Sequence, residues 1–184
     1  ERASRIVSSL RGFVGNLEQV DHVVDLNSIV EECMDFVRIR AREAGIRVDV
    51  ELHPEPVPVR CERVLTGQVV INLCFNALEE MAQATAEERI VRVRTSADGD
   101  VGTFSVEDRG GGAIGLSYDQ MFESASTTKA DGSGIGLGLS YRIITRQHGT
   151  IGGKPAEPHG SVFWFSLPRT VGDTRGIPVR DAKE

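Results

Sequence analysis

The sequence has few cysteines, and their arrangement excludes two common uses of the residue. Only three occur among 184 residues, Cys33, Cys61 and Cys74. Their odd number and wide spacing fit neither a disulfide framework nor a metal site. Cys33 and Cys74 fall within apolar helical patterns, which favours burial in a core, and unpaired cysteines fit a reducing cytoplasm.

A net positive charge and apolar runs of membrane-spanning length are also missing. The formal net charge is -6, so no general affinity for nucleic acid or anionic membrane is expected, and any phosphate must bind at a local site. No apolar run approaches the roughly 20 residues of a membrane helix, and the charged N-terminal end does not resemble a signal peptide. The four histidines show no metal spacing. We expect a cytoplasmic location, no nucleic-acid partner and no membrane contact by this segment.

Hydrophobic periodicity predicts an α/β fold. Ser28 and Glu31 have the spacing of a capping box, and Gly45 and Gly149 are typical helix stops. Helices are predicted over residues 2–20, 27–44, 62–84 and 137–148, and strands over 46–52, near 59, 90–95, 103–107, 150–152 and 161–167. A polar connector over 18–26 and a long loop over 113–135 join some of these. The expected fold is a two-layer sandwich, a mixed β-sheet with helices on one face, preceded by one N-terminal helix.

Asp108 comes directly after a predicted strand and is followed by Gly110 and Gly112. These glycines allow a sharp turn and a close approach of the backbone to a ligand. A carboxylate fixed at a strand end can accept a hydrogen bond from an exocyclic amine such as that of adenine. The alternative is a tight turn with a solvated aspartate.

A second glycine-rich segment, residues 132–140, precedes the last predicted helix. Exposed N–H groups and the helix dipole make a helix N-terminus an anion site, and Gly134, Gly136 and Gly138 would let phosphate oxygens come close. The spacing is not that of a P-loop or a convincing dinucleotide fingerprint. The alternative is an ordinary glycine-rich loop.

Asn72 and Asn76 lie four residues apart on one predicted helix. Their amide oxygens could hold Mg²⁺, which keeps waters and shares phosphate oxygens. The alternative is a buried amide that ties the helix to a neighbour. Lys129, in the long loop, could reach a terminal phosphate as a point charge or be a solvated loop lysine.

Together and in this order, four segments resemble the catalytic ATP-binding domain of sensor histidine kinases. NLCFNA at 72–77 resembles the N box, DRGGG at 108–112 the first glycine box and GIGLGLS at 134–140 the second. Phe122-Glu123, followed by Thr127-Thr128-Lys129, resembles the F box, and the fourteen-residue step from Asp108 to Phe122 is similar to that family's spacing. The resemblance covers about residues 25–168.

This resemblance implies the Bergerat ATP-binding fold of the GHKL superfamily, with ATP and Mg²⁺ as ligands. Asp108 would contact the adenine amine, Asn72 and Asn76 would hold Mg²⁺ and phosphates, and Thr127, Thr128 and Lys129 would belong to a flexible lid. The phosphate cradle would consist of Gly134, Ile135, Gly136, Leu137, Gly138 and Leu139. Glu79-Glu80-Met81 resembles the nitrogen- and oxygen-sensing branch of these kinases.

The same resemblance divides the chain into three parts. Residues 1–24 would be the end of the dimerisation and phosphoacceptor helix with its linker, 25–168 the ATP-binding domain and 169–184 a polar, mobile tail. No histidine here has the acceptor context, so the acceptor is expected upstream in a longer kinase. The implied partners are the phosphoacceptor hairpin of the same kinase, a response-regulator receiver domain and a second kinase copy in a homodimer.

Some positions depart from the family pattern and keep other functions open. Arg109 and Gly111 stand where Asn and Pro are common, and Ser124-Ala125 where Pro-Phe is common. The altered lid mildly favours a non-catalytic docking module, whereas the presence of Asp108, Asn76 and the glycines argues against one. A hydrolytic ATPase of the same superfamily would need a glutamate base at Asn72. A serine kinase of the anti-sigma type would leave the N-terminal helix unexplained.

Overall fold

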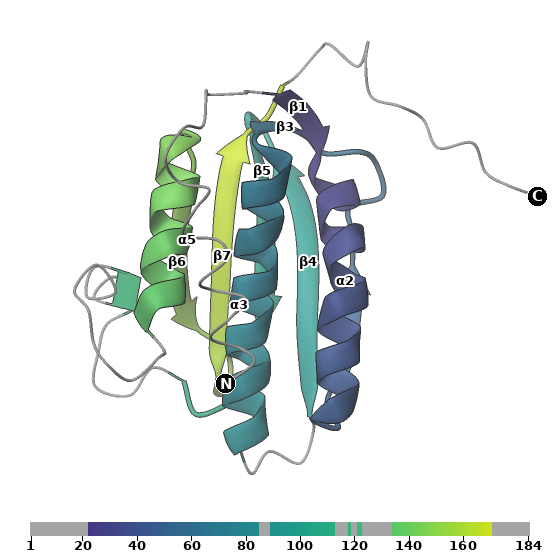
Figure 1. Cartoon of the computed structure of the whole chain (residues 1–184), viewed down its shortest axis with the longest axis vertical. Helices are drawn as coiled ribbons and strands as arrows, with labels where there is room; N and C mark the ends of the chain where they lie inside the picture. Colours follow the sequence, from purple (N-terminus) through teal and green to yellow (C-terminus); the bar gives the residue numbers. More distant parts are fainter. Residues whose placement is uncertain (1–21, 85–88, 113–117, 119–120, 123–133, 171–184) are drawn as a thin grey trace, which may run out of the picture.

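A computed structural model describes residues 22–84, 89–112, 118, 121–122 and 134–170 (Figure 1). Its helices and strands follow the predicted α/β order. They are β1 (His22–Asp25), α2 (Leu26–Glu43), β2 (Arg47–Glu51), β3 (Pro58–Cys61), α3 (Arg63–Gln83), β4 (Ile90–Asp98), β5 (Val101–Glu107), α5 (Gly134–Arg146), β6 (Thr150–Pro155) and β7 (Ser161–Pro168). The predicted N-terminal helix, residues 2–20, lies outside the described residues.

The central sheet has five strands in the order β2-β4-β5-β7-β6. β2 pairs parallel with β4, and all other neighbours are antiparallel, so the sheet is mixed as predicted. β1 and β3 form a separate antiparallel pair. Helices α2, α3 and α5 lie side by side over one face of the central sheet, with α3 in the middle (Figure 1). This is the predicted two-layer sandwich.

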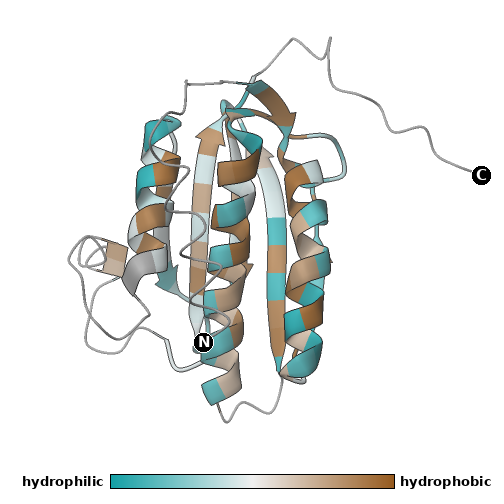
Figure 2. Ribbon diagram, viewed as in Figure 1, coloured by the Kyte–Doolittle hydropathy of each residue, from teal (hydrophilic) through white to brown (hydrophobic). Residues whose placement is uncertain are grey.

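The core lies between the helices and this face of the sheet. The apolar bands of α2, α3 and the strands are visible in Figure 2. Phe104 of β5 and Phe165 of β7 are fully buried and stack with ring centroids 5.1 Å apart. Cys33, Cys61 and Cys74 are buried, which confirms the predicted core positions of Cys33 and Cys74. No described helix is long and apolar enough to cross a membrane.

The start of α2 differs from the prediction. The N-cap is Asp25, whose side chain accepts from the Asn27 N–H, while the Ser28 hydroxyl donates to the Asp25 carbonyl oxygen. The capping box at Ser28 is therefore wrong. Residues 22–25 are a strand and not a connector, because pairing with β3 brings Asp25 to the helix start, where its Oδ1 also accepts from the Val57 N–H. That pairing depends on contacts more than 30 residues apart, which local patterns do not reveal.

The end of α5 also differs in detail. His148 takes the left-handed conformation, with φ 58°, that Gly149 was expected to supply. The His148 N–H donates to the Thr145 carbonyl oxygen, and the Gly149 N–H donates to the Ile144 carbonyl oxygen. These two hydrogen bonds are those of a Schellman motif at a helix C-terminus. A Cβ at Gly149 would collide with the carbonyl oxygen of Ser166 and the side chain of Ile144. Gly149 is thus required by close packing against β7.

The first two residues after β7 are hydrogen-bonded to other parts of the fold. The Arg169 N–H donates to the Asp100 carbonyl oxygen at 2.7 Å, and the Thr170 N–H donates to the Pro58 carbonyl oxygen at 3.0 Å. The rest of the predicted tail, residues 171–184, lies outside the described residues.

Candidate nucleotide site

Asp108 lies at the end of β5, as predicted, and its side chain is completely buried. Its backbone N–H donates to the Ser161 carbonyl oxygen at 2.9 Å, and its Oδ1 accepts from the Gly110 N–H at 2.8 Å. Its other oxygen, Oδ2, is buried and has no hydrogen-bond partner among the described residues. The alternative of a solvated aspartate is therefore wrong. Oδ2 is a buried acceptor that can take a hydrogen bond from a donor.

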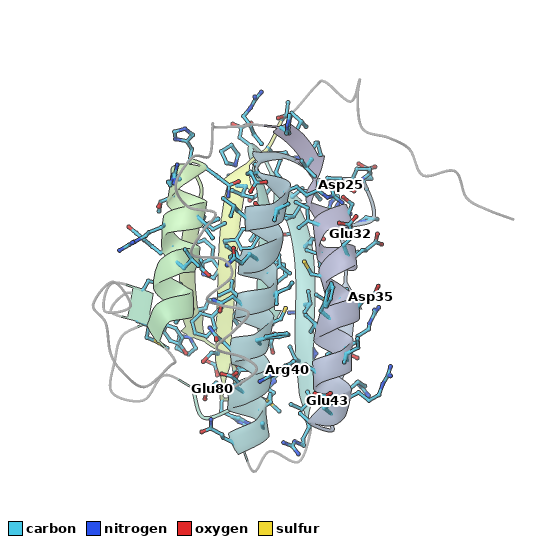
Figure 3. The ribbon with its side chains drawn as sticks, in the orientation of Figure 1. Asp25, Glu32, Asp35, Arg40, Glu43 and Glu80 are labelled. Carbon is cyan, nitrogen blue, oxygen red and sulfur yellow. The ribbon has the colours of Figure 1, made fainter. Side chains whose placement is uncertain are left out.

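The surroundings of Asp108 favour its neutral form. Burial raises the pKa of Asp108 to about 6, while hydrogen bonding from the Gly110 and Ser161 backbone lowers it and the charges of Glu80 and Glu107 raise it further. Glu80, near the end of α3, is labelled in Figure 3. A ligand that donates a hydrogen bond to Oδ2 would stabilise the charged carboxylate of Asp108.

The turn after Asp108 is enclosed by two other elements. A Cβ at Gly110 would come within 3.0 Å of the Glu80 Cβ on α3. Gly160, just before β7, has φ 103°, and a Cβ there would collide with the Asp108 carbonyl oxygen. Gly112 has a positive φ of 73°, which confirms the sharp turn inferred from the glycines.

An ion-pair network fixes the end of β5 from the other side. Glu107 pairs with arginines of β4 and of the turn, at 3.5 Å to Arg92, 3.1 Å to Arg94 and 3.0 Å to Arg109. The Arg109 guanidinium also donates to the Glu157 carbonyl oxygen. Arg109, one of the departures from the family pattern, thus ties the turn to the segment between β6 and β7.

The second glycine segment lies inside α5 rather than before it. The helix begins at Gly134, three residues earlier than predicted. Glycine is a poor helix former, so the many glycines of this segment led to a predicted helix start that is too late. The first N–H groups of the helix, the anion-binding groups of a helix N-terminus, therefore belong to the predicted glycine segment. Leu137 is buried in the core, Gly138 is buried, and Leu139 is half-buried against the core.

Gly136 serves a close contact between α3 and α5. A Cβ at Gly136 would collide with the Asn72 side-chain oxygen. The Asn72 Nδ2 donates to the Ser140 hydroxyl of α5 at 3.0 Å. Asn72 thus ties its helix to a neighbour through its amide nitrogen, and the metal role of its amide oxygen stays a prediction.

Asn76 lies one turn further along α3 and is half-buried. It has no side-chain hydrogen bond among the described residues, so its amide is available to a ligand. No group of three or more His, Cys, Asp or Glu in the part of the chain that the structure describes could hold a metal ion. A metal here would depend on amide oxygens and on groups that the ligand brings.

Several predicted site residues cannot be placed. Thr127, Thr128, Lys129 and the altered pair Ser124-Ala125 lie outside the described residues, as does the side chain of Ile135. Phe122 of the F box is buried and packs edge-on against Phe163 of β7, with ring centroids 6.1 Å apart.

Three supporting residues were not predicted from the sequence. Ser140 orients Asn72, Ser161 accepts from the Asp108 N–H, and the Sδ of Met81 accepts from the Arg109 N–H at 3.1 Å. Ser140 was within the glycine motif and could have been noticed four residues after Gly136. The other two act through long-range contacts that leave no local pattern.

The site therefore combines a buried acceptor at the end of β5, amides on α3 and a helix N-terminus at α5, three elements that are separated in the sequence. A family model for "Histidine kinase-, DNA gyrase B-, and HSP90-like ATPase" matches residues 61–171. The chain belongs to this family. The resemblance predicted from the four motifs is confirmed, and within the family this is an ATP-binding domain of the histidine-kinase kind.

Relatives of this histidine-kinase domain include sensor proteins of bacteria. The sensor protein FixL of Bradyrhizobium diazoefficiens is 34% identical over 167 residues, covering 91% of this chain and 33% of that protein. The histidine-protein kinase AtoS of Escherichia coli K12 is 35% identical over 147 residues, covering 79% of this chain and 23% of that protein. The chain thus spans a third or less of the length of these two relatives.

Solved structures of histidine kinases share the fold. The catalytic domain of histidine kinase ThkA superposes with a TM-score of 0.70 at 27% identity, covering 83% of this chain and 97% of that chain. ThkA in complex with the response regulator TrrA gives the same TM-score at 24% identity, covering 92% of this chain and 48% of that chain.

Proposed function

We propose that this domain binds Mg-ATP between the Asp108 turn and the N-terminus of α5. The observation that carries the proposal is the buried Oδ2 of Asp108, which has no partner among the described residues. A buried acceptor without a donor is costly, and the exocyclic amine of adenine would supply the donor. Gly110 and Gly112 let the base approach this turn.

The phosphates would lie between α3 and α5. Gly134, Ile135, Gly136, Leu137, Gly138 and Leu139 form the cradle in this proposal, with backbone N–H groups as donors. Asn72 and Asn76 hold Mg²⁺ together with phosphate oxygens. The amide nitrogen of Asn72 donates to Ser140, so Asn72 would hold the metal through its amide oxygen. Thr127, Thr128 and Lys129 cover the terminal phosphate.

In the whole protein, the domain would position the γ-phosphoryl group for transfer to a histidine on an acceptor helix. Positioning and charge neutralisation are the main contributions that such a transfer needs. The proposed partners are the acceptor hairpin, which residues 1–24 would continue, a response-regulator receiver domain and a second kinase copy. Residues 25–168 would be the nucleotide-binding unit and 169–184 a tail. ATP as substrate fits a cytoplasmic location.

ATP hydrolysis as the purpose is less consistent with this site. An amide cannot take a proton from water, and Asn72, at the position where related ATPases have a glutamate, has its amide nitrogen bound to Ser140.

Two measurements test the proposal. Titration calorimetry with ATP, with and without Mg²⁺, should show a metal-dependent gain in affinity that Asn76→Ala abolishes. An equal gain in Asn76→Ala would remove Asn76 from the metal site. In a second experiment, the chain is mixed with its acceptor hairpin and radiolabelled ATP. Acid-labile label on the hairpin supports a kinase, free phosphate alone an ATPase, and neither a docking module.

A further inference from the structure

The turn after β5 has three consecutive backbone N–H groups, and each has its own acceptor. The Asp108 N–H donates to the Ser161 carbonyl oxygen at 2.9 Å, and the Gly110 N–H donates to the Asp108 Oδ1 at 2.8 Å. Between them, the Arg109 N–H donates to the thioether sulfur of Met81 at 3.1 Å. Two of the acceptors are oxygens, and the third is a weak acceptor supplied by α3.

Met81 is fully buried. The next residue of the turn, Gly110, approaches the same end of α3 so closely that a Cβ there would lie 3.0 Å from the Glu80 Cβ and 3.2 Å from the Glu80 carbonyl carbon. The end of α3 is therefore packed directly against the turn, and the Met81 sulfur lies within that contact.

The peptide group that joins Asp108 to Arg109 makes a close contact at each of its polar atoms. Its N–H is bound to Met81, and its carbonyl oxygen faces Gly160 so closely that any side chain there would collide with it. The orientation of this peptide group determines where the adjoining Asp108 side chain points. Gly160 makes one of these two contacts, and Met81 makes the other.

We infer that Met81 is a positioning residue for Asp108. The thioether of Met81 orients the turn so that the buried Oδ2 of Asp108 faces the bound base. The inference rests on the proposed nucleotide site and adds to it a residue that does not touch the ligand. Met81 acts through the backbone of Arg109, so it would affect recognition of the adenine amine more than binding of the phosphates.

The test replaces the sulfur without changing the size of the side chain much. Met81→Leu removes the acceptor, and Met34→Leu is the matched control because Met34 is also buried, on α2. Amide hydrogen exchange of the ligand-free chain is measured first. We expect the Arg109 N–H to exchange at least about tenfold faster in Met81→Leu than in Met34→Leu.

Nucleotide binding provides the second readout. ATP affinity in Met81→Leu should fall by about five- to thirtyfold relative to Met34→Leu, the range expected for one buried donor left without its acceptor. The preference for ATP over GTP should fall as well, whereas affinity for inorganic triphosphate should match the control. A general loss of packing would weaken all three ligands equally.

Unchanged exchange at Arg109 would overturn the contact itself. Faster exchange with ATP affinity equal to that of Met34→Leu would overturn the positioning role. Failure of the nucleotide site is recognised separately by Asp108→Ala, which would then bind ATP as the wild type does. In that case the hydrogen-exchange result would still report on the contact between Met81 and Arg109.

Discussion

The amide of Asn72 on α3 donates to the hydroxyl of Ser140 on α5 across 3.0 Å. The two residues are 68 positions apart in the sequence. Gly136, one helical turn before Ser140, leaves the space that the Asn72 amide occupies. This contact aligns the helix that carries both asparagines with the helix whose N-terminus would bind phosphate, so it couples the two halves of the proposed site.

Loss of the Ser140 hydroxyl should weaken this coupling. Ser140 is 2% exposed, so Ser140→Ala should lower the free energy of unfolding by about 1–2 kcal/mol, because the Asn72 amide loses its acceptor. Thr145→Val is the control on the same helix, since the Thr145 hydroxyl is exposed and bonds only within α5 among the described residues. Urea unfolding measures both. Equal effects of the two substitutions would show that the Asn72–Ser140 bond adds nothing to stability.

A side chain at Gly136 should push α3 and α5 apart. Gly136→Ala should cost about 1–3 kcal/mol by overpacking against Asn72, although alanine is the better helix former. Gly67→Ala in α3 is the control, because its Cβ would lie 3.4 Å from the Cys33 sulfur, an ordinary contact. The Gly67→Ala substitution should leave the free energy of unfolding unchanged or raise it by up to about 1 kcal/mol.

A second substitution identifies the cause of the Gly136→Ala defect. Combining Gly136→Ala with Asn72→Ala should cost less than the sum of the single effects, by roughly 0.5–3 kcal/mol, since the collision then disappears. Strict additivity in thermal or urea unfolding would place the defect elsewhere.

Asp108 should make stability and nucleotide affinity respond oppositely to pH. Its pKa is raised from 3.8 to about 6 in the folded protein, so the native state binds more protons than the unfolded state between these values. Its contribution to stability therefore falls as pH rises through this window. ATP affinity should instead fall as pH drops below about 6, because protonation removes the acceptor for adenine.

Asp108→Asn separates these two effects. At neutral pH the variant should be more stable than the wild type by up to about 3 kcal/mol, and the difference should vanish near pH 4. Its ATP affinity should be about ten- to a hundredfold lower, because a charge-assisted hydrogen bond is lost. Unfolding and calorimetry over this pH range check both. A wild type whose ATP affinity does not change between about pH 5 and 7 would contradict the role of Asp108.

The three cysteines should not react in the native protein. All are buried, and burial raises the pKa of Cys33 to about 11 and that of Cys74 still further. Since the thiolate is the reactive form, iodoacetamide near neutral pH should label the folded chain very slowly and the denatured chain fully. Rapid labelling of the folded chain at Cys33 would show that the contact between α2 and α3 opens readily.

Local sequence patterns predicted most of the fold. The patterns that predict β4, β5 and the long helix with both asparagines depend on neighbouring residues, and each element was predicted close to its observed bounds. The N-cap of α2 was predicted incorrectly, because Asp25 is placed at the helix start by pairing with β3, which is distant in the sequence. The start of α5 was predicted too late, because its first turn is rich in glycine, a poor helix former.

The sequence by itself determined the family and suggested the residues proposed for the site, because the order and spacing of Asn76, Asp108 and the glycines are local features of the chain. Only the tertiary structure decided that Asn72 is bound to Ser140, that Met81 supports the turn and that the Oδ2 of Asp108 is buried without a partner among the described residues. Burial and hydrogen bonds between distant segments exist only after the elements pack, so no local pattern carries them.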